Sequence, residues 1–273
     1  MPVGLADAVL AVLARDRAVP AAEAGAIAVL AAPDDAVAEV QLDPPDGALA
    51  ALIGFAAPGT RAVIDRAASG AQIDAALAPA LTRWLDALAP HARHWGIKLG
   101  ASPQLYVRGR FEVPLAASVA APGRAGALDH GLAAAGASHF AMLGVELAGG
   151  AIARHVGYVA VTDPQAAAAL AAARGLTAGV TGSIAADLAL LAPGTAWTHL
   201  SWDLATPAGP VKVDVGARPA GEAIALAARF GLDGGALAAR LAALGLGDPS
   251  HVGLRLGAPS ARALALYFRV TAS

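Results

Sequence analysis

The fold is decided by a hairpin pattern that is clearest over residues 141–162, AMLGVELAGGAIARHVGYVAVT. Apolar and other residues alternate over Ala141–Leu147 and again over Ile152–Thr162, and the small residues between these runs are typical of a turn. Asp163 follows as a good N-cap, and alanine-rich helical sequence continues to Leu191. The segment therefore predicts a β-hairpin followed by helices, which together make one ββαα unit.

The same unit occurs five times along the 273 residues, and the last hairpin ends the chain. The first strands begin with a period of about 47 to 58 residues, which is the range of repeat architectures, near Val37, Trp95, Met142, Trp197 and Val252. The predicted hairpins cover residues 37–55, 94–113, 141–162, 196–215 and 251–270. Helices are predicted between the hairpins, including 60–68 and 72–88, and before the first hairpin at 5–18 and 21–30.

We predict that the five units close into a ten-stranded antiparallel β-barrel of the α/β class, ringed by about ten helices and with an open polar lumen. Helical pairs between hairpins keep the strands sequential and antiparallel, which disfavours a parallel eight-stranded barrel. An open sheet would leave two unpaired edges, whereas closure gives the N-terminal helical pair a place between the fifth and first hairpins. We expect residues 1–273 to form a single domain.

Composition excludes several classes of function. A formal charge of −2 and a pI near 6.4 provide no basic surface for nucleic acid. The chain has no cysteine, which excludes disulfides and thiolate metal sites and fits the cytoplasm. No stretch of about 18 residues lacks a charged side chain, so we expect no membrane span. The first residues carry Asp7 and lack a basic leader, so we interpret them as a helix and not as a signal peptide.

Strand periodicity sorts each strand into an apolar face and a polar face. The apolar face includes Trp95, Ile97, Leu99, Leu105, Val107, Phe111, Leu143, Val145, Leu147, Val211, Val213, Val215, Leu264, Leu266 and Phe268, and should meet the helices. The opposite face carries charged and phenolic residues, which a packed barrel centre would not show. The polar face should therefore surround a wet cavity, and this cavity is the expected site.

Cations and tyrosines together suggest the ligand of this cavity. Four of the five hairpins point at least one cation inward, and several like charges in a partly desolvated space favour a polyanion such as a diphosphate. All three tyrosines of the chain lie on the second strand of a hairpin with luminal parity: Tyr106, Tyr158 and Tyr267. A phenol offers a hydrogen bond to phosphate and a π-face that stabilises a cation, as a reaction through an allylic carbocation requires.

The chain resembles the ABBA or PT-barrel family of aromatic prenyltransferases. The resemblance covers the whole architecture, and at residue level it rests on Tyr106-Val-Arg108, Arg154 to Tyr158, Val211-Lys-Val213 and Leu266-Tyr-Phe-Arg269. It implies a ten-stranded antiparallel barrel ringed by helices, and an enzyme that moves a prenyl group from an isoprenoid diphosphate to an electron-rich aromatic small molecule through an allylic cation. Such enzymes belong to secondary metabolism.

The resemblance also implies roles for individual residues. Diphosphate binding falls to the inward cations Lys98, Arg108, Arg154, Lys212 and Arg269, and shielding of the cation falls to Tyr106, Tyr158 and Tyr267. Arg255, an inward cation near a strand end, is a further candidate for substrate binding. Glu39, on the first strand, is the expected catalytic acid residue, which could accept the ring proton or orient a phenol or indole N–H. The partners would be a prenyl diphosphate and an aromatic small molecule, with the protein a monomer.

Several alternatives remain open from the sequence. The same barrel could be a cyclase or hydrolase of isoprenoid diphosphates, which the 4% aromatic content would suit, or a non-catalytic barrel that binds a small molecule. Glu146, Asp203 and Asp214 can be salt-bridge partners that neutralise luminal cations. His91 and His94 are interpreted as capping or surface residues, and no metal site is assigned. No cofactor is predicted, and Mg²⁺ is possible although no motif indicates it.

Overall fold

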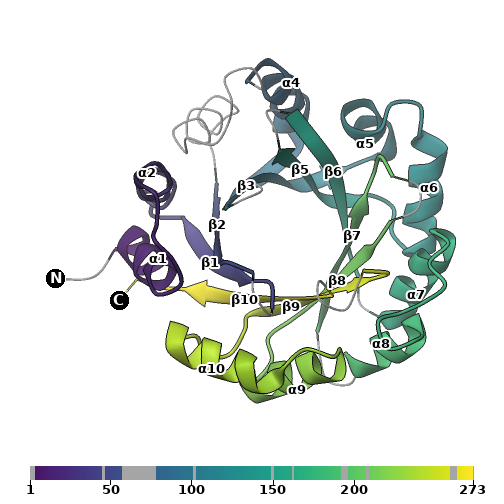
Figure 1. The fold of residues 1–273 in the computed structure, drawn as a ribbon. Coiled ribbons are helices and arrows are strands. Elements are labelled where there is room, and N and C mark those ends of the chain that lie inside the picture. Colours follow the sequence, from purple (N-terminus) through teal and green to yellow (C-terminus); the bar gives the residue numbers. More distant parts are fainter. Residues whose placement is uncertain are drawn as a thin grey trace.

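The strands form a closed barrel. The computed structural model describes residues 4–44, 47–56, 78–100, 103–148, 151–161, 163–191, 196–206, 209–258 and 263–272. Each strand pairs antiparallel with its neighbours along the chain, and the first strand pairs with the last (Figure 1). The strands are β1 Val37–Leu42, β2 Ala50–Phe55, β3 Ala92–Leu99, β4 Gln104–Phe111, β5 Phe140–Ala148, β6 Ala151–Ala160, β7 Trp197–Asp203, β8 Val211–Val215, β9 His251–Leu256 and β10 Leu264–Val270. The predicted ten-stranded antiparallel barrel is confirmed.

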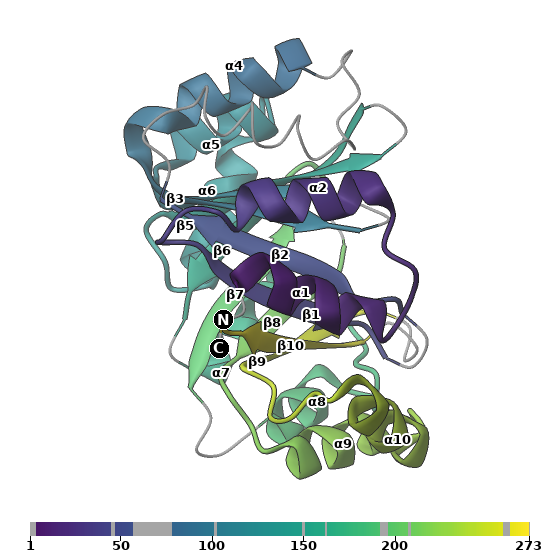
Figure 2. The same ribbon diagram turned by 90° about the vertical axis from the view of Figure 1, so that its left-hand side faces the viewer.

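Helices surround the barrel on its outside, as Figures 1 and 2 show from two directions. Within the described ranges they are α1 Leu5–Ala14, α2 Ala21–Leu30, α4 Ala78–Leu88, α5 Val113–Ala120, α6 Ala125–Ala134, α7 Pro164–Ala173, α8 Ile184–Leu190, α9 Ala220–Arg229 and α10 Gly234–Leu244, with a short 3-10 helix η2 at Ala89–His91. The N-terminal helix α1 contacts β1, β2 and β10, and α2 contacts β2. The first helical pair therefore covers the closure between the last and first hairpins, as predicted.

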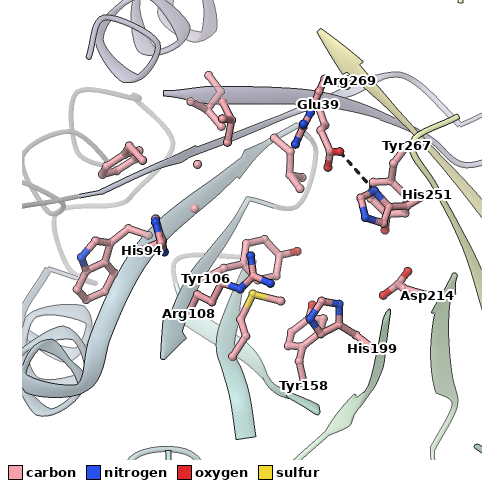
Figure 3. Close-up of a pocket in the computed structure, with 18 of the residues that line it drawn as sticks. Glu39, His94, Tyr106, Arg108, Tyr158, His199, Asp214, His251, Tyr267 and Arg269 are labelled. Carbon is pink, nitrogen blue, oxygen red and sulfur yellow. Dashed lines mark ion pairs between the residues drawn. The ribbon is translucent and has the colours of Figure 1, made fainter. Parts of the chain in front are cut away.

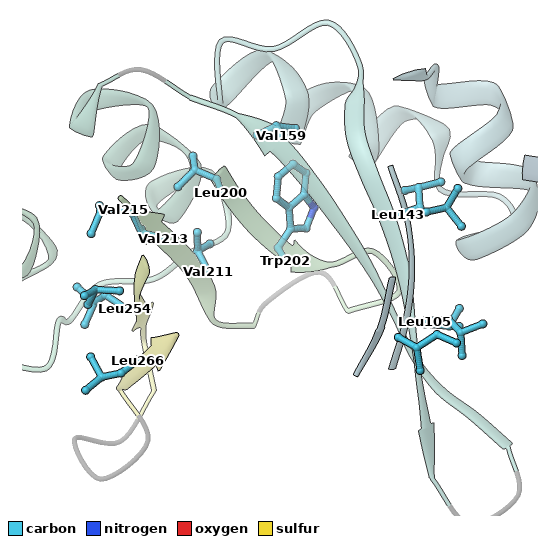
Figure 4. Packing of buried hydrophobic residues seen from close by; sticks show 14 of the residues in the cluster. Leu105, Leu143, Val159, Leu200, Trp202, Val211, Val213, Val215, Leu254 and Leu266 are labelled. Carbon is cyan, nitrogen blue, oxygen red and sulfur yellow. The ribbon is translucent and has the colours of Figure 1, made fainter. Parts of the chain in front are cut away.

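The hydrophobic core lies between the barrel and its helices. The side chains of β8 at Val211, Val213 and Val215 are fully buried on the outer face, and Figure 4 shows them on the same side of the wall as Leu254 and Leu266. Alternation along a strand then turns every second residue to the interior. The apolar face predicted from the sequence is thus the outer face of the barrel, and this leaves the polar positions to line the lumen.

Local capping explains where some elements begin and end. The Asp163 carboxylate accepts from the backbone N–H groups of Gln165 and Ala166, so it caps α7 as predicted. The second strand of the second hairpin ends at Phe111 and not at the predicted 113, because α5 begins at Val113 and Pro114 in its first turn cannot donate a ladder hydrogen bond.

Some sequence predictions lie outside what the structure describes. The predicted helix at 60–68 and the first part of the predicted helix at 72–88 fall there, and α4 begins at Ala78. Among the described residues no helix is long and apolar enough to cross a membrane. That residues 1–273 form a single domain stays a prediction.

Candidate active site

The lumen contains a cavity of about 450 Å³. Residues from all ten strands line it, because neighbouring strands bring their inward positions to the same level. Seven of the ten site residues predicted from the sequence are among them: Glu39, Tyr106, Arg108, Tyr158, Lys212, Tyr267 and Arg269. Figure 3 labels all of these except Lys212. Strand parity therefore brought most of the predicted site residues to this one space.

Glycines on the inward face make room for the larger side chains. A Cβ on Gly144 would lie 3.0 Å from Cδ1 of the Tyr106 ring, and a Cβ on Gly253 would lie 2.5 Å from Cε of Lys212 and 2.7 Å from Oδ1 of Asp214. Cβ atoms do not approach neighbours this closely without displacing them. These two strand glycines therefore allow Tyr106 and Lys212 to lie flat against the barrel wall.

The three tyrosines form part of the cavity wall. The rings of Tyr106 and Tyr158 meet edge to face with centroids 5.8 Å apart, and the Tyr106 hydroxyl donates to Gln104. Burial is the largest cause that raises the pKa of Tyr106, and burial likewise raises the pKa values of Tyr158 and Tyr267 well above 10. All three are therefore neutral phenols at physiological pH, able to donate hydrogen bonds and to present a π-face.

Lys212 is held inside the lumen by a residue of its own strand and by a residue of β10. Its ammonium group lies 2.6 Å from the Tyr267 hydroxyl, 4.7 Å from the centroid of the same ring and 2.6 Å from Asp214 Oδ1. The carboxylate of Asp214 stabilises the charged ammonium, in agreement with the role of salt-bridge partner that the sequence suggests for it. Lys212 is therefore a fixed cation in the cavity whose charge is partly compensated.

Arg108 and Arg269 differ from Lys212. Both are exposed and line the cavity, and within the described part of the chain neither makes an ion pair or a hydrogen bond. His199 lines the same space, and burial lowers its pKa, with Arg108 contributing in the same direction. Two guanidinium groups are thus available to an anionic ligand in this cavity.

Glu39 contacts two residues at the start of β9, Ser250 and His251. The Ser250 hydroxyl donates to Glu39 Oε1 at 2.8 Å, and Nδ1 of His251 lies 3.4 Å from the same oxygen and 3.2 Å from the Ser250 hydroxyl. Burial alone would raise the pKa of Glu39, but the contacts with His251 and Ser250 outweigh it and lower the pKa. Glu39 is therefore ionised at neutral pH.

Three predicted site residues do not line this cavity, which corrects the expectation that all ten surround one space. Lys98, Arg154 and Arg255 lie near the hairpin turns at the other end of the barrel. Their carboxylate neighbours there are Asp43, Glu146 and Asp203. We call these six residues the hairpin-end cluster.

The hairpin-end cluster is electrostatically paired. Arg154 lies 3.5 Å from Glu146 and 3.9 Å from Asp203, and Arg255 lies 3.2 Å from Asp43. Lys98 lies in a separate cavity with Asp43, and burial is the largest cause that lowers its pKa to about 8. Cations and carboxylates therefore balance at this end of the lumen.

Three histidines line the cavity although none was among the predicted site residues. His94 is exposed, as expected, but it lies opposite Arg108 in the register of β3 and β4 and lines the cavity. His251 is the first residue of β9 and His199 lies near the start of β7, and both face the lumen. In the sheet, His251 lies opposite Tyr267 and His199 lies opposite Asp214. The alternation of each strand predicts that these histidines face the lumen, but it does not predict which residues lie opposite them on the neighbouring strands. Among the described residues no group of three or more His, Cys, Asp or Glu side chains could hold a metal ion.

Comparison with solved structures identifies the same fold. The 5-dimethylallyltryptophan synthase from Streptomyces coelicolor matches with a TM-score of 0.62 and 16% identity over 98% of this chain and 97% of its own. A 6-dimethylallyltryptophan synthase from Micromonospora olivasterospora, solved with DMASPP and Trp, matches with a TM-score of 0.60 and 17% identity over 97% of each chain. The apo form of the prenyltransferase PriB matches at 0.57 and 15%, over 98% and 96%.

No family model and no curated protein matches the sequence. At identities of 15% to 17% the likeness to the solved structures extends to the fold alone, and it confirms the PT-barrel fold that the sequence resemblance implied.

Proposed function

We propose that this protein transfers a prenyl group from an isoprenoid diphosphate to an electron-rich aromatic small molecule. The observation that carries the proposal is the meeting of three tyrosines and three cations around one luminal cavity. Support also comes from solved proteins of the same fold, which are named as dimethylallyltryptophan synthases and as a prenyltransferase. Tryptophan and other indoles are therefore the first acceptors to test.

The cations would serve the leaving group. As the allylic C1–O bond breaks, its electron pair goes to the diphosphate, and negative charge grows on the oxygens of that group. Arg108 and Arg269, which have no ion pair among the described side chains, and the fixed ammonium of Lys212 would stabilise this charge. The ammonium of Lys212 is already held by Tyr267 and Asp214, so it needs little reorganisation when the bond breaks, which lowers the barrier to ionisation.

The tyrosines would serve the carbocation. Tyr106 and Tyr158 present neutral rings to the cavity, and an aromatic face attracts a cation through its quadrupole. The rings also keep water away from the allylic cation, so that the aromatic acceptor captures it. A volume of about 450 Å³ lies within the range of small-molecule sites.

Glu39 would orient the acceptor. Its Oε1 is used by Ser250 and His251, whereas Oε2 makes no hydrogen bond among the described residues and can accept from an indole N–H or a phenol O–H. The carboxylate is ionised, so this hydrogen bond would be charge-assisted.

The test is incubation with dimethylallyl diphosphate, alone and with L-tryptophan, free indole or a simple phenol, followed by mass spectrometry and an assay of released diphosphate. We expect an aromatic product that is heavier by one dimethylallyl group, and little diphosphate release without acceptor. Diphosphate release with no heavier aromatic product would instead favour a hydrolase or cyclase in the same barrel. Binding without turnover would favour a small-molecule carrier.

Two further properties belong to the same proposal. We expect the reaction to proceed without added metal, and assays with EDTA and with Mg²⁺ test this directly. We also expect a monomeric protein made of one domain, which light scattering and a single cooperative unfolding transition would support.

A further inference from the structure

The contacts of Glu39 indicate which ring nitrogen of neutral His251 carries the hydrogen. Ser250 can donate only one proton, and its hydroxyl lies 2.8 Å from Glu39 Oε1 and 3.1 Å from the backbone oxygen of Tyr267, both of which only accept. Nδ1 of His251 faces the same carboxylate at 3.4 Å. Because an ionised carboxylate cannot donate and the single proton of Ser250 has two other acceptors, we assign the hydrogen to Nδ1. In the neutral ring, Nε2 then has a free lone pair.

Nε2 is available to a ligand in the cavity. His251 lines the cavity with a side chain that is 37% exposed, and its ring meets the Tyr267 ring edge to face at 6.4 Å. In the described part of the protein, Nε2 makes no hydrogen bond or ion pair. Figure 3 shows His251 beside Glu39 and Tyr267, with the ion pair drawn between the carboxylate and the imidazole.

The other cavity histidines lack this arrangement. His94 and His199 line the same space, but neither makes an ion pair or hydrogen bond with a carboxylate among the residues described. A carboxylate that accepts from Nδ1 orients an imidazole and stabilises the imidazolium that forms when Nε2 takes a proton. Within this cavity, His251 is therefore the histidine with the arrangement of a general base.

We propose that His251 is the general base that removes the ring proton of the aromatic acceptor, with Glu39 and Ser250 as its positioning residues. This inference rests on the proposed prenyl transfer and deepens it, because it assigns the last chemical step. It also gives the two oxygens of Glu39 different tasks. Oε1 holds His251, and Oε2 faces the acceptor.

The step balances without any further reactant. Attack of the ring carbon on the allylic cation forms the new C–C bond and leaves a positively charged ring in which that carbon still carries its original hydrogen. The C–H bond then breaks, its electron pair restores the aromatic ring, and the proton moves to His251 Nε2. The imidazolium is stabilised by the Glu39 carboxylate and afterwards loses the proton to solvent or to the released diphosphate.

The test compares His251→Gln with His130→Gln, a matched control on the exposed face of α6. The substrates are dimethylallyl diphosphate and L-tryptophan, either unlabelled or deuterated on the indole ring. We expect kcat of His251→Gln to fall by about 10²-fold, which is the typical contribution of a general base, and a primary isotope effect to emerge because proton removal becomes slow. His130→Gln should behave as wild type.

Two more variants separate chemistry from folding. Imidazole added to His251→Ala should restore product formation, which an unfolded protein could not show. Glu39→Gln should lose less activity but should also reveal the isotope effect, which a purely structural role would not produce.

The outcomes distinguish this inference from the proposed function. Product formation by His251→Gln at the wild-type rate and without an isotope effect would overturn the inference alone. Loss of activity in His251→Ala that imidazole does not restore, combined with no isotope effect in His251→Gln, would overturn it as well. A wild-type protein that prenylates no acceptor would overturn the proposed function and this inference with it.

Discussion

The two ends of the barrel lumen carry similar numbers of charges but arrange them differently. At the hairpin end, Arg154 and Arg255 each pair with a carboxylate from a neighbouring strand or turn. At the other end, Arg108 and Arg269 line the cavity without an ion pair among the described residues. The difference teaches that an inward position does not by itself make a cation available to a ligand, because position along the strand decides which carboxylates it meets.

The chain connectivity explains this difference. In a sequential antiparallel barrel all hairpin turns lie at one end, and all helical connections lie at the other. Asp43 and Asp203 stand at the ends of the first strands of their hairpins, so they meet the cations of that end. All three tyrosines line the cavity, which lies at the other end of the lumen from the hairpin-end cluster.

The largest expected effect is the loss of activity when Arg108, which has no ion pair among the described residues, is replaced by glutamine. The same replacement of the paired Arg154 is the comparison. Arg108→Gln should lower kcat/KM by about 10²-fold, since it removes a charge that stabilises the leaving diphosphate. Arg154→Gln should change kcat/KM by less than about threefold, because the Arg154 side chain is 49% exposed and a surface ion pair contributes little. Steady-state kinetics with dimethylallyl diphosphate and tryptophan measures both. Equal losses in the two variants would remove the distinction between the two ends.

A smaller effect is expected from the aromatic wall. Tyr158→Leu keeps an apolar side chain but removes the π-face, and should lower kcat by about tenfold, in line with a desolvated cation–π interaction. Tyr158→Phe keeps the ring and should retain most of kcat. The ratio of diphosphate released to product formed should rise in the leucine variant, since water then reaches the cation. If phenylalanine and leucine lower kcat equally, the hydroxyl and not the ring face of Tyr158 is what the reaction uses.

The smallest effect concerns stability at the hairpin end. Burial lowers the pKa of Lys98 to about 8, so the folded state binds this proton less tightly than the unfolded state. The cost is fully present below pH 8 and disappears as the pH rises towards the ordinary lysine value of 10.5. Lys98→Met should therefore raise the free energy of unfolding at pH 7 by about 1 kcal/mol, allowing for partial exposure.

Denaturant unfolding at pH 7 and pH 10 measures this change. The advantage of Lys98→Met over wild type should shrink at pH 10, where the folded protein no longer carries the charge. An advantage that is independent of pH would show that the gain comes from packing of the methionine.

Much of the fold could be predicted because its signals are local. Alternation along the strands, turn residues and the Asp163 cap depend on neighbours a few residues away, and the strand β1 begins and ends where the sequence indicated. Ring closure was predictable for a different reason, since it leaves no unpaired edge and gives α1 a surface to cover.

The site could be predicted only in part because pairing is not local. Parity placed Tyr106, Tyr158 and Tyr267 in the lumen, but it contains no information on which carboxylate each cation meets. Glu39 and His251 are 212 positions apart and come together only through the closure of β1 on β10 and the pairing of β10 with β9. Arg108 and Arg269, which have no ion pair among the described residues, show the same inward strand parity in the sequence as the paired Arg154 and Arg255.

The position of a bound diphosphate shows which end of the lumen holds the anionic ligand. A crystal structure of the protein with dimethylallyl diphosphate or inorganic pyrophosphate would locate the two phosphorus atoms within the lumen. We expect both phosphorus atoms in the cavity, within hydrogen-bonding distance of Arg108 and beside Lys212 and Arg269. A diphosphate held by Lys98, Arg154 and Arg255, with the hairpin-end ion pairs opened, would contradict this expectation.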